Sequence, residues 1–259
     1  MPAADRTAIV TGATEGIGKA IALALLADGV RVIAVGRSGE KLDALRAEAG
    51  AAAGLLDCAA LDICDSAAFG DALAGWTGRR GAITDLVNAA GILEPGGLMD
   101  AAPDAIRRVI ATNLTATLEV TLPVARHMAA RRRGSIVTIG SNSGTTARVG
   151  LGAYPASKAG IIHAMKCLGL ELAPFGVRCN IVSPGSTDTA MQRRYQTAAT
   201  SREAMLKGDP GTFRLGIPLG RMAEPGDVSD LVLFLLSDRA RHITMENIVL
   251  DGGATLGAR

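Results

Sequence analysis

A tyrosine and a lysine four residues apart are the side chains of this sequence best suited to proton chemistry. Tyr154 and Lys158 frame the segment Tyr-Pro-Ala-Ser-Lys. In a helix this spacing places both side chains on one face, one turn apart. An ammonium beside a phenol favours the phenolate and lowers the pKa of the phenol from about 10. The pair is therefore predicted to act as a general acid and base near neutral pH.

Ser141 is the expected partner of this pair. It follows an expected strand and Gly140, and the loop between Ser141 and Tyr154 is long enough to return the serine hydroxyl to the phenol. The alternative interpretation is a polar residue that only ends a strand. With Tyr154 and Lys158 in place, catalysis is the better interpretation.

A glycine-rich turn joins the first expected strand to the first expected helix. It has the sequence Thr11-Gly12-Ala13-Thr14-Glu15-Gly16-Ile17-Gly18. Glycines let a backbone approach a pyrophosphate, and a helix N-terminus offers free N–H groups at the positive end of its dipole. Such turns also serve close packing alone, but this position in the chain favours a dinucleotide site.

The end of the second expected strand bears on the choice between NAD and NADP. An acidic residue there would hold the ribose hydroxyls and repel a 2′-phosphate. Here the strand ends in Gly36-Arg37, and Arg37 is able to bind a 2′-phosphate through charge-assisted hydrogen bonds. The sequence therefore favours NADP, the alternative being a solvated loop arginine.

Strands and helices alternate along the whole chain, and the strands are continuous apolar runs. This pattern predicts one α/β domain over 1–259, a doubly wound parallel sheet of the Rossmann type with helices on both faces. The polar segment 187–216 follows a strand end and is expected to be an irregular substrate lid. Strands are expected over 7–11, 31–35, 57–61, 86–88, 135–139, 178–183 and 248–250, and helices over 16–28, 38–49, 66–77, 103–133 (bent at Pro123), 154–174 and 224–236.

Composition limits the possible partners. The chain has 259 residues, 48% of them hydrophobic, and a formal net charge of only +2, which gives no broad case for nucleic acid or an anionic membrane. The four cysteines have neither CxxC spacing nor a histidine at metal-ligand spacing. We expect free, mostly buried thiols, no metal site and a cytoplasmic location.

These motifs, in this order, resemble the short-chain dehydrogenase/reductase family over the whole chain. Besides the turn described above, Asn88-Ala89-Ala90-Gly91 resembles the family's fourth-strand motif. The resemblance implies a homotetramer that uses NAD or NADP. It implies cofactor contacts from the turn residues Thr11, Gly12, Glu15, Gly16, Ile17 and Gly18, and also from Arg37, Asp62, Ile63, Asn88, Ala89, Gly91, Pro184, Gly185, Thr187 and Thr189.

The same resemblance implies four catalytic residues, Asn113, Ser141, Tyr154 and Lys158. Tyr154 would exchange the hydroxyl proton with the substrate, and Ser141 would hold the carbonyl oxygen. Lys158 would also bind the nicotinamide ribose, and Asn113 would hold a water that links Lys158 to solvent. On the residues alone, Asn113 could instead cap a helix kink.

The second half of the chain is also similar to one group within that family, the 2,3-dihydro-2,3-dihydroxybenzoate dehydrogenases of siderophore synthesis. The similarity rests on such stretches as 183–193, 215–220 and 242–257. It implies oxidation of a cyclic secondary alcohol, followed by aromatisation of the ring. Arg148 is the expected anchor for a ring carboxylate, and Met191 and Gln192 are expected to face the ring.

Two positions depart from that group. Gly36-Arg37 replaces the acid that the resemblance implies for NAD users, and Ala190 interrupts an acidic run before Met191. The enzyme is therefore either a dehydrogenase with switched cofactor preference or one that acts on a related ring, such as a dihydro-hydroxyanthranilate. An NADPH-dependent ketoreductase of the 3-oxoacyl or polyketide type is the alternative. A nucleotide-sensing protein without turnover is a further one.

Overall fold

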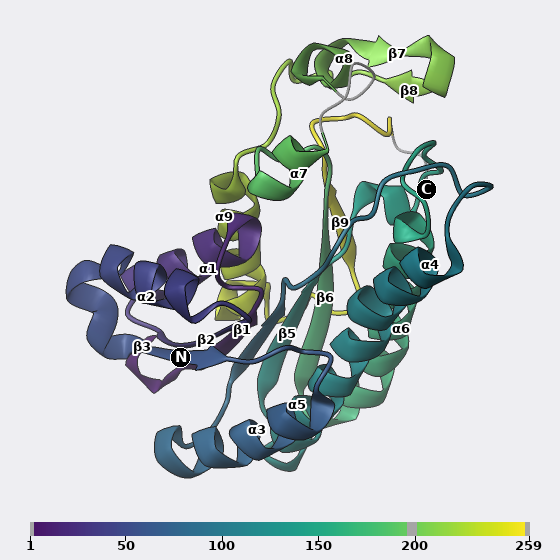
Figure 1. Cartoon of the computed structure of the whole chain (residues 1–259). Coiled ribbons are helices and arrows are strands. Elements are labelled where there is room, and N and C mark those ends of the chain that lie inside the picture. Colours follow the sequence, from purple (N-terminus) through teal and green to yellow (C-terminus); the bar gives the residue numbers. More distant parts are fainter. Residues whose placement is uncertain (1–2, 196–200, 257–259) are drawn as a thin grey trace.

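The computed structural model describes residues 3–195 and 201–256 and contains a seven-stranded parallel sheet at its centre (Figure 1). The strand order is β3-β2-β1-β4-β5-β6-β9, the doubly wound arrangement expected from the sequence. Every predicted strand is present, with each end within one residue of its expected position. The strands are β1 (Thr7–Thr11), β2 (Arg31–Gly36), β3 (Leu56–Ala60), β4 (Asp85–Asn88), β5 (Gly134–Ile139), β6 (Val177–Pro184) and β9 (Asn247–Leu250).

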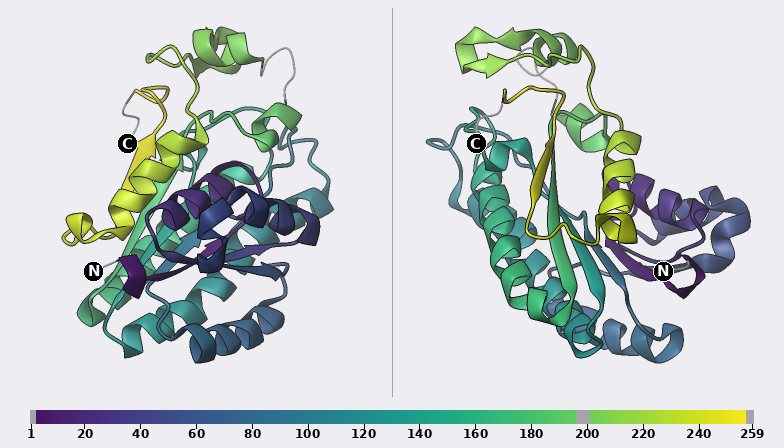
Figure 2. Two further views of the ribbon diagram at one scale, coloured as in Figure 1. Left: turned by 90° about the vertical axis from the view of Figure 1, so that its left-hand side faces the viewer. Right: turned by 180° about the vertical axis from the view of Figure 1, so that it is seen from behind.

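Helices cover both faces of this sheet (Figures 1 and 2). The strands of this sheet are apolar throughout because successive side chains point to opposite faces, and both faces are buried. In β1, for example, Ile9 packs into one hydrophobic cluster and Val10 into the other. One face carries α1 (Gly16–Ala27), α2 (Gly39–Glu48) and α9 (Pro225–Leu236), and the other carries α3 (Ser66–Arg80), α4 (Pro103–Ile110), α5 (Thr117–Ala130) and α6 (Tyr154–Leu172).

The predicted single helix over 103–133 is wrong in one respect. A π-helical segment, Ala111–Ala116, separates α4 from α5. Pro123, the expected bend, lies inside α5 instead. Because π-helical turns often occur at functional sites, the position of Asn113 inside this segment is important below.

The segment 187–216 is not irregular as predicted. Its described residues, 187–195 and 201–216, form two short α-helices and a two-stranded hairpin, and they extend beyond the carboxyl end of β6 (Figure 1). The elements are α7 (Ala190–Arg194), α8 (Arg202–Lys207), β7 (Gly208–Asp209) and β8 (Arg214–Leu215). All are too short for hydrophobic periodicity to reveal them.

The four cysteines are free, as predicted, but they are not mostly buried. Cys179 is buried and Cys58 is partly buried, whereas Cys64 and Cys167 are exposed. The expected burial rested only on the general tendency of free cysteines to be buried, and nothing at the positions of Cys64 and Cys167 in the sequence indicated their exposure. Among the helices of residues 3–195 and 201–256, none is long and apolar enough to cross a membrane.

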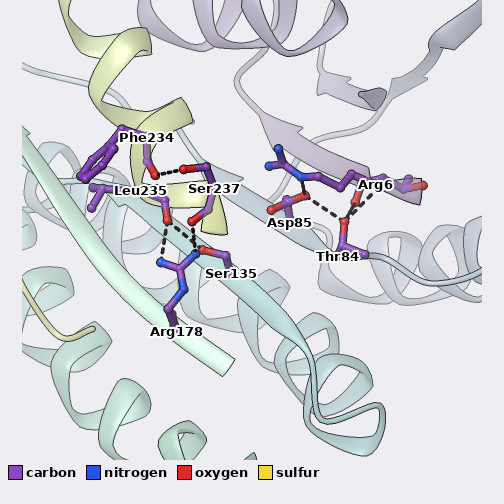
Figure 3. Close-up of polar contacts among 9 residues, drawn as sticks. Arg6, Thr84, Asp85, Ser135, Arg178, Phe234, Leu235 and Ser237 are labelled. Atoms are coloured by element: carbon purple, nitrogen blue, oxygen red, sulfur yellow. Dashed lines mark hydrogen bonds and ion pairs between the residues drawn. The ribbon is translucent and has the colours of Figure 1, made fainter. Parts of the chain in front are cut away.

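A buried ion pair lies at the amino end of the sheet, at the edge opposite to the site described below (Figure 3). The Arg6 Nε donates to Asp85 Oδ2 over 3.0 Å, and Thr84 Oγ1 donates to the same carboxylate oxygen over 2.8 Å. Burial raises the pKa of Asp85, and the Arg6 guanidinium opposes that rise. Nearby, Arg178 donates to the carbonyl oxygens of Leu235 and Ser237 at the end of α9.

Asp85→Ala is expected to lower the free energy of unfolding by about 3–5 kcal/mol, because it leaves the Arg6 guanidinium buried without its carboxylate. Urea unfolding followed by circular dichroism measures the loss. The double variant Arg6→Met/Asp85→Leu removes both charges and is expected to regain most of the stability. A loss below about 1 kcal/mol for Asp85→Ala would show that the pair contributes little.

Candidate active site

Ser141, Tyr154 and Lys158 converge at the carboxyl edge of the sheet. Tyr154 opens α6, and Ser141 follows the end of β5, where its hydroxyl is near enough to lower the pKa of the phenol. The Lys158 Nζ lies 5.6 Å from the centre of the Tyr154 ring. The predicted convergence of these three side chains is therefore present.

The pKa expected for the phenol is wrong in direction for the structure as it stands. Burial raises the pKa of Tyr154 to about 12, although the hydrogen bond with Ser141 opposes this. The Lys158 ammonium donates to the carbonyl oxygen of Ile139 over 2.7 Å, so its hydrogen bond does not go to the phenol. Burial also lowers the pKa of Lys158 to about 8, which leaves it mostly protonated at pH 7.

Asn113 lies next to this group and is fully engaged with the chain. Its Oδ1 accepts from the Ile92 N–H over 2.8 Å, while its Nδ2 donates to the Ile92 carbonyl oxygen and to Ser157 Oγ. A Cβ at Gly91 would lie 3.3 Å from Asn113 Oδ1 and 3.7 Å from Lys158 Nζ. The π-helical segment thus turns Asn113 toward the residues that follow β4 and toward Lys158 on α6.

The glycine-rich turn fits a dinucleotide phosphate. Gly12 has a φ of +66°, and a Cβ there would lie 2.7 Å from the backbone of Ala90. A Cβ at Gly18 would lie 2.2 Å from the Gly12 carbonyl oxygen, so α1 packs against the turn only because residue 18 is glycine. Close backbone approach is the function of glycines in nucleotide-binding turns.

The start of α1 also lacks a side-chain cap. Glu15 occupies the N-cap position without accepting a bond from the helix backbone. Its carboxylate instead binds Lys41 Nζ at 2.7 Å and Arg194 Nη2 at 2.6 Å, and these bonds lower its pKa. An uncapped helix start beside glycines offers N–H groups to a pyrophosphate, so these residues fit the group that the sequence implies.

Two of the predicted cofactor residues hold the turn in place. Thr11 Oγ1 accepts from the N–H groups of Ala89 and Ala90, which ties the turn to the end of β4. The buried amide of Asn88 donates to Thr121 and Thr138 and so connects β4 with its neighbours. Both side chains thus fix the backbone beside the glycine-rich turn.

The second strand end is exposed. Arg37 is mostly solvent-accessible, and its Nη1 lies 4.0 Å from Asp62 Oδ2. The other Asp62 oxygen accepts from the Cys64 N–H over 3.0 Å, which shapes the turn after β3. The side chain of Ile63 is buried in the core, while Ile17 packs against the opposite hydrophobic cluster.

The segment after β6 closes the same edge. Pro184 ends β6, and a Cβ at Gly185 would lie 2.6 Å from Asp251 Cβ. Thr187 is buried, and Thr189 caps α7 by accepting from the Gln192 N–H over 3.2 Å. These residues meet the glycine-rich turn, since a Cβ at Gly16 would lie 3.3 Å from the Thr189 methyl group.

The three residues predicted to contact the substrate, Arg148, Met191 and Gln192, lie on two different segments. Arg148 is half-buried in the loop before α6, and Met191 is partly buried on α7. The Gln192 amide contacts the sulfur of Met205 at 3.5 Å, within the segment 187–216. A further candidate is Arg214, which is half-buried on β8 and is affected by the charge of Arg148. A lone arginine in a two-residue strand has no sequence pattern that would predict it.

A comparison with protein families settles what this arrangement is. The family described as short chain dehydrogenase matches residues 6–200. The chain belongs to the short-chain dehydrogenase family. Members share the CH–OH chemistry of dehydrogenases and reductases, so the protein is an oxidoreductase that acts on CH–OH groups with a nicotinamide dinucleotide.

Individual relatives cover almost the whole chain. The 2,3-dihydro-2,3-dihydroxybenzoate dehydrogenase of Bacillus subtilis is 42% identical over 97% of this chain and 97% of its own length. The 3-oxoacyl-[acyl-carrier-protein] reductase of Thermotoga maritima is 35% identical over 97% and 98%. A solved short-chain type dehydrogenase/reductase from Mycobacterium ulcerans has a TM-score of 0.88 at 32% identity, over 97% of this chain and 90% of that one. The short-chain dehydrogenase described here is thus more similar to the first relative than to the second.

Proposed function

We propose that this short-chain dehydrogenase oxidises a ring CH–OH group of a dihydrodiol carboxylate such as 2,3-dihydro-2,3-dihydroxybenzoate, or of a closely related dihydro ring carboxylate. The observation that carries the proposal is the Ser141–Tyr154–Lys158 group with the half-buried Arg148 on the loop that leads into it. The 42% identity to a dehydrogenase of that name supports the substrate class. Residues 187–216 would serve as the substrate lid, with Met191 and Gln192 on it.

The side chains divide the reaction among them. Ser141 Oγ, fixed by a hydrogen bond with Ser143, holds the substrate oxygen through the change from alcohol to ketone. Tyr154 removes the hydroxyl proton, and the Lys158 ammonium stabilises the phenolate. The glycine-rich turn at Gly12 and the start of α1 would hold a nicotinamide dinucleotide, which would supply the hydride acceptor. Asn113 acts through its bonds to Ile92, which hold the residues beside Lys158 in place.

A spectrophotometric assay at 340 nm tests the proposal directly. Purified protein is supplied with NAD or NADP and with 2,3-dihydro-2,3-dihydroxybenzoate, dihydro-hydroxyanthranilate, simple secondary alcohols and, in the reverse direction, 3-oxoacyl thioesters. Turnover of a ring carboxylate at a kcat/KM at least tenfold above that of any other class is expected. Preference for a thioester would instead identify the ketoreductase alternative, to which the 35% identical reductase and Arg37 lend support. If the protein binds the cofactor but turns over none of these compounds, the remaining interpretation is a nucleotide-sensing protein without enzymatic activity.

NADP is the cofactor that we propose. A Cβ at Gly36 would lie 2.4 Å from the Thr14 methyl group, so no carboxylate occupies the end of β2 without displacing Thr14. Arg37 follows, largely solvent-accessible and loosely paired with Asp62 at 4.0 Å. A pair this exposed contributes little, so the guanidinium is free to bind a 2′-phosphate.

Arg37→Ala is therefore expected to raise the KM for NADP by about 10- to 100-fold and the KM for NAD by less than about threefold, because only NADP loses charge-assisted hydrogen bonds. Initial rates with each cofactor measure this. Arg46→Ala, an exposed arginine on α2, is the matched control. Equal changes for both cofactors would contradict the assignment.

Assembly and location complete the proposal. On the family resemblance we expect a homotetramer in the cytoplasm. Size-exclusion chromatography with light scattering measures the mass of the assembly directly, and a monomer would contradict this expectation.

A further inference from the structure

Two arginines from separate loops lie around the carboxyl end of β6. Arg214, on the lid hairpin, donates from Nη2 to Ser186 Oγ over 2.8 Å, and Ser186 follows the end of β6. Arg148, on the loop between β5 and α6, lies within the electrostatic reach of Asp251, which follows β9. The two guanidinium groups also affect one another, because the charge of Arg148 lowers the pKa of Arg214.

Neither arginine has the partner that a buried charge requires. Both are half-buried, and burial lowers the pKa of each. In residues 3–195 and 201–256, no carboxylate forms an ion pair with either of them within 4.0 Å. Two carboxylates act on the arginines from a distance, Asp251 on Arg148 and Asp209 on Arg214, but neither forms the ion pair. The oxygens of Asp251 accept from Asn142, Thr255 and the Gly253 N–H, and those of Asp209 accept from Thr212 and the Gly211 N–H.

Other arginines of the chain, by contrast, form ion pairs with carboxylates. Arg108 binds Glu94 with two hydrogen bonds of 2.8 Å, and Arg221 binds Asp227 with two more, although all four side chains are near the surface. Surface pairing of this kind contributes little to stability. Two half-buried like charges that act on one another, neither in an ion pair with a carboxylate, cost free energy. That cost is recovered when an anion binds between them.

We propose that Arg148 and Arg214 bind the substrate carboxylate together, so that Arg214 is a specificity-determining residue supplied by the lid. This inference rests on the proposed function and deepens it. A carboxylate is planar and accepts bidentate bonds from guanidinium groups, and it offers an oxygen to each arginine here. Because Arg214 is on the lid and Arg148 on the loop into Tyr154, one carboxylate would hold the lid against the catalytic loop. Neutral rings would lack this connection.

Arg214→Gln tests the assignment because it removes the charge and keeps a polar side chain for Ser186. The substrates are 2,3-dihydro-2,3-dihydroxybenzoate and its counterpart without the carboxylate, 5,6-dihydroxycyclohexa-1,3-diene. We expect kcat/KM for the carboxylated ring to fall about 30-fold, mainly through KM, and that for the neutral ring to change less than about threefold. Arg214→Lys is expected to recover part of the loss. Arg148→Gln is expected to behave like Arg214→Gln.

The double variant and a lid control sharpen the test. If both arginines bind one carboxylate, the loss in Arg148→Gln/Arg214→Gln differs from the product of the single losses. Lys207→Gln removes a charge from an exposed pair with Glu203 on the same lid and is expected to change neither substrate. Equal losses on both rings for Arg214→Gln would show a structural role for Arg214, and no loss on either would show no role; both overturn the inference.

A binding measurement separates this inference from the proposed function. Calorimetric titration with benzoate and with phenol does not depend on turnover. Benzoate binding that is lost in Arg214→Gln supports the anion site even if no dihydrodiol is oxidised, in which case only the proposed function fails. Oxidation of the dihydrodiol by the wild type, with equal KM for the charged and neutral rings, would leave the proposed reaction in place and overturn the anion site.

Discussion

Tyr154→Phe is expected to lower kcat for ring oxidation by about 10³-fold while changing the dissociation constant of the dinucleotide less than about threefold. The phenol is the proton acceptor of the proposed reaction, and a positioned general base contributes rate factors of this size. Burial raises the pKa of this phenol to about 12, and the nearby Ser141 hydroxyl opposes the rise. Phenylalanine keeps the ring and removes only the group that exchanges the proton. Stopped-flow oxidation and fluorescence titration of the reduced cofactor measure the two quantities.

The chain supplies its own control for this substitution, because it has only two tyrosines. The hydroxyl of Tyr195 donates to the carbonyl oxygen of Leu93 and has no place in the proton transfer. Tyr195→Phe is expected to lower kcat less than about tenfold. Similar losses in the two variants, or more than about a tenth of the wild-type rate in Tyr154→Phe, would refute the assigned role.

The parts of the fold and site that the sequence predicts well have local causes. Apolar runs mark the strands of the large sheet to within one residue, because strands buried on both faces are mostly apolar, although β3 (Leu56–Ala60) contains no β-branched residue. The convergence of Ser141, Tyr154 and Lys158 follows from one helix start and one strand end. Gly12 and Gly18 are required by contacts within a single turn and its neighbour, so their spacing alone is informative.

What the sequence does not show depends on contacts between distant segments. The π-helical segment at Asn113 has no spacing of its own in the sequence, since it is stabilised by bonds to Ile92 and Ser157. The importance of Arg214 arises only when the lid brings it near Arg148. The pKa of Tyr154 is a balance between burial, which raises it, and the Ser141 hydroxyl, which lowers it. The spacing of Tyr154 and Lys158 in the sequence shows neither of these two effects.

That balance gives the second prediction, on Lys158. Lys158→Met is expected to lower kcat by about 10²-fold at pH 7 and to move the rise of the pH–rate profile for oxidation to higher pH. Burial opposes formation of the phenolate. A cation 5.6 Å from the centre of the phenol ring is expected to stabilise the phenolate once the proton has left. Without this cation the phenolate is less stable, so more alkaline solution is needed to form the base. Initial rates between pH 6 and 10 measure both effects.

The same substitution is expected to stabilise the fold, which excludes misfolding as the reason for lost activity. Burial lowers the pKa of Lys158 from 10.5 to about 8, so stability contributed by this group is present above pH 10.5 and is lost as the pH falls through 8. At pH 7 the buried ammonium therefore costs stability, and methionine removes that cost. The carbonyl oxygen of Ile139 loses its bond in exchange. The net gain is expected to be about 2 kcal/mol at pH 7.

Urea unfolding at pH 7 and pH 10 measures this gain, which is expected to shrink at the higher pH as the wild-type lysine loses its charge. Lys166→Met, an exposed lysine on the same helix, is the matched control and is expected to change neither rate nor stability. An inactive Lys158→Met protein that is less stable than the wild type would contradict the prediction. A protein that is more stable and nearly inactive would show that the fold carries a buried charge at a cost because the reaction requires it.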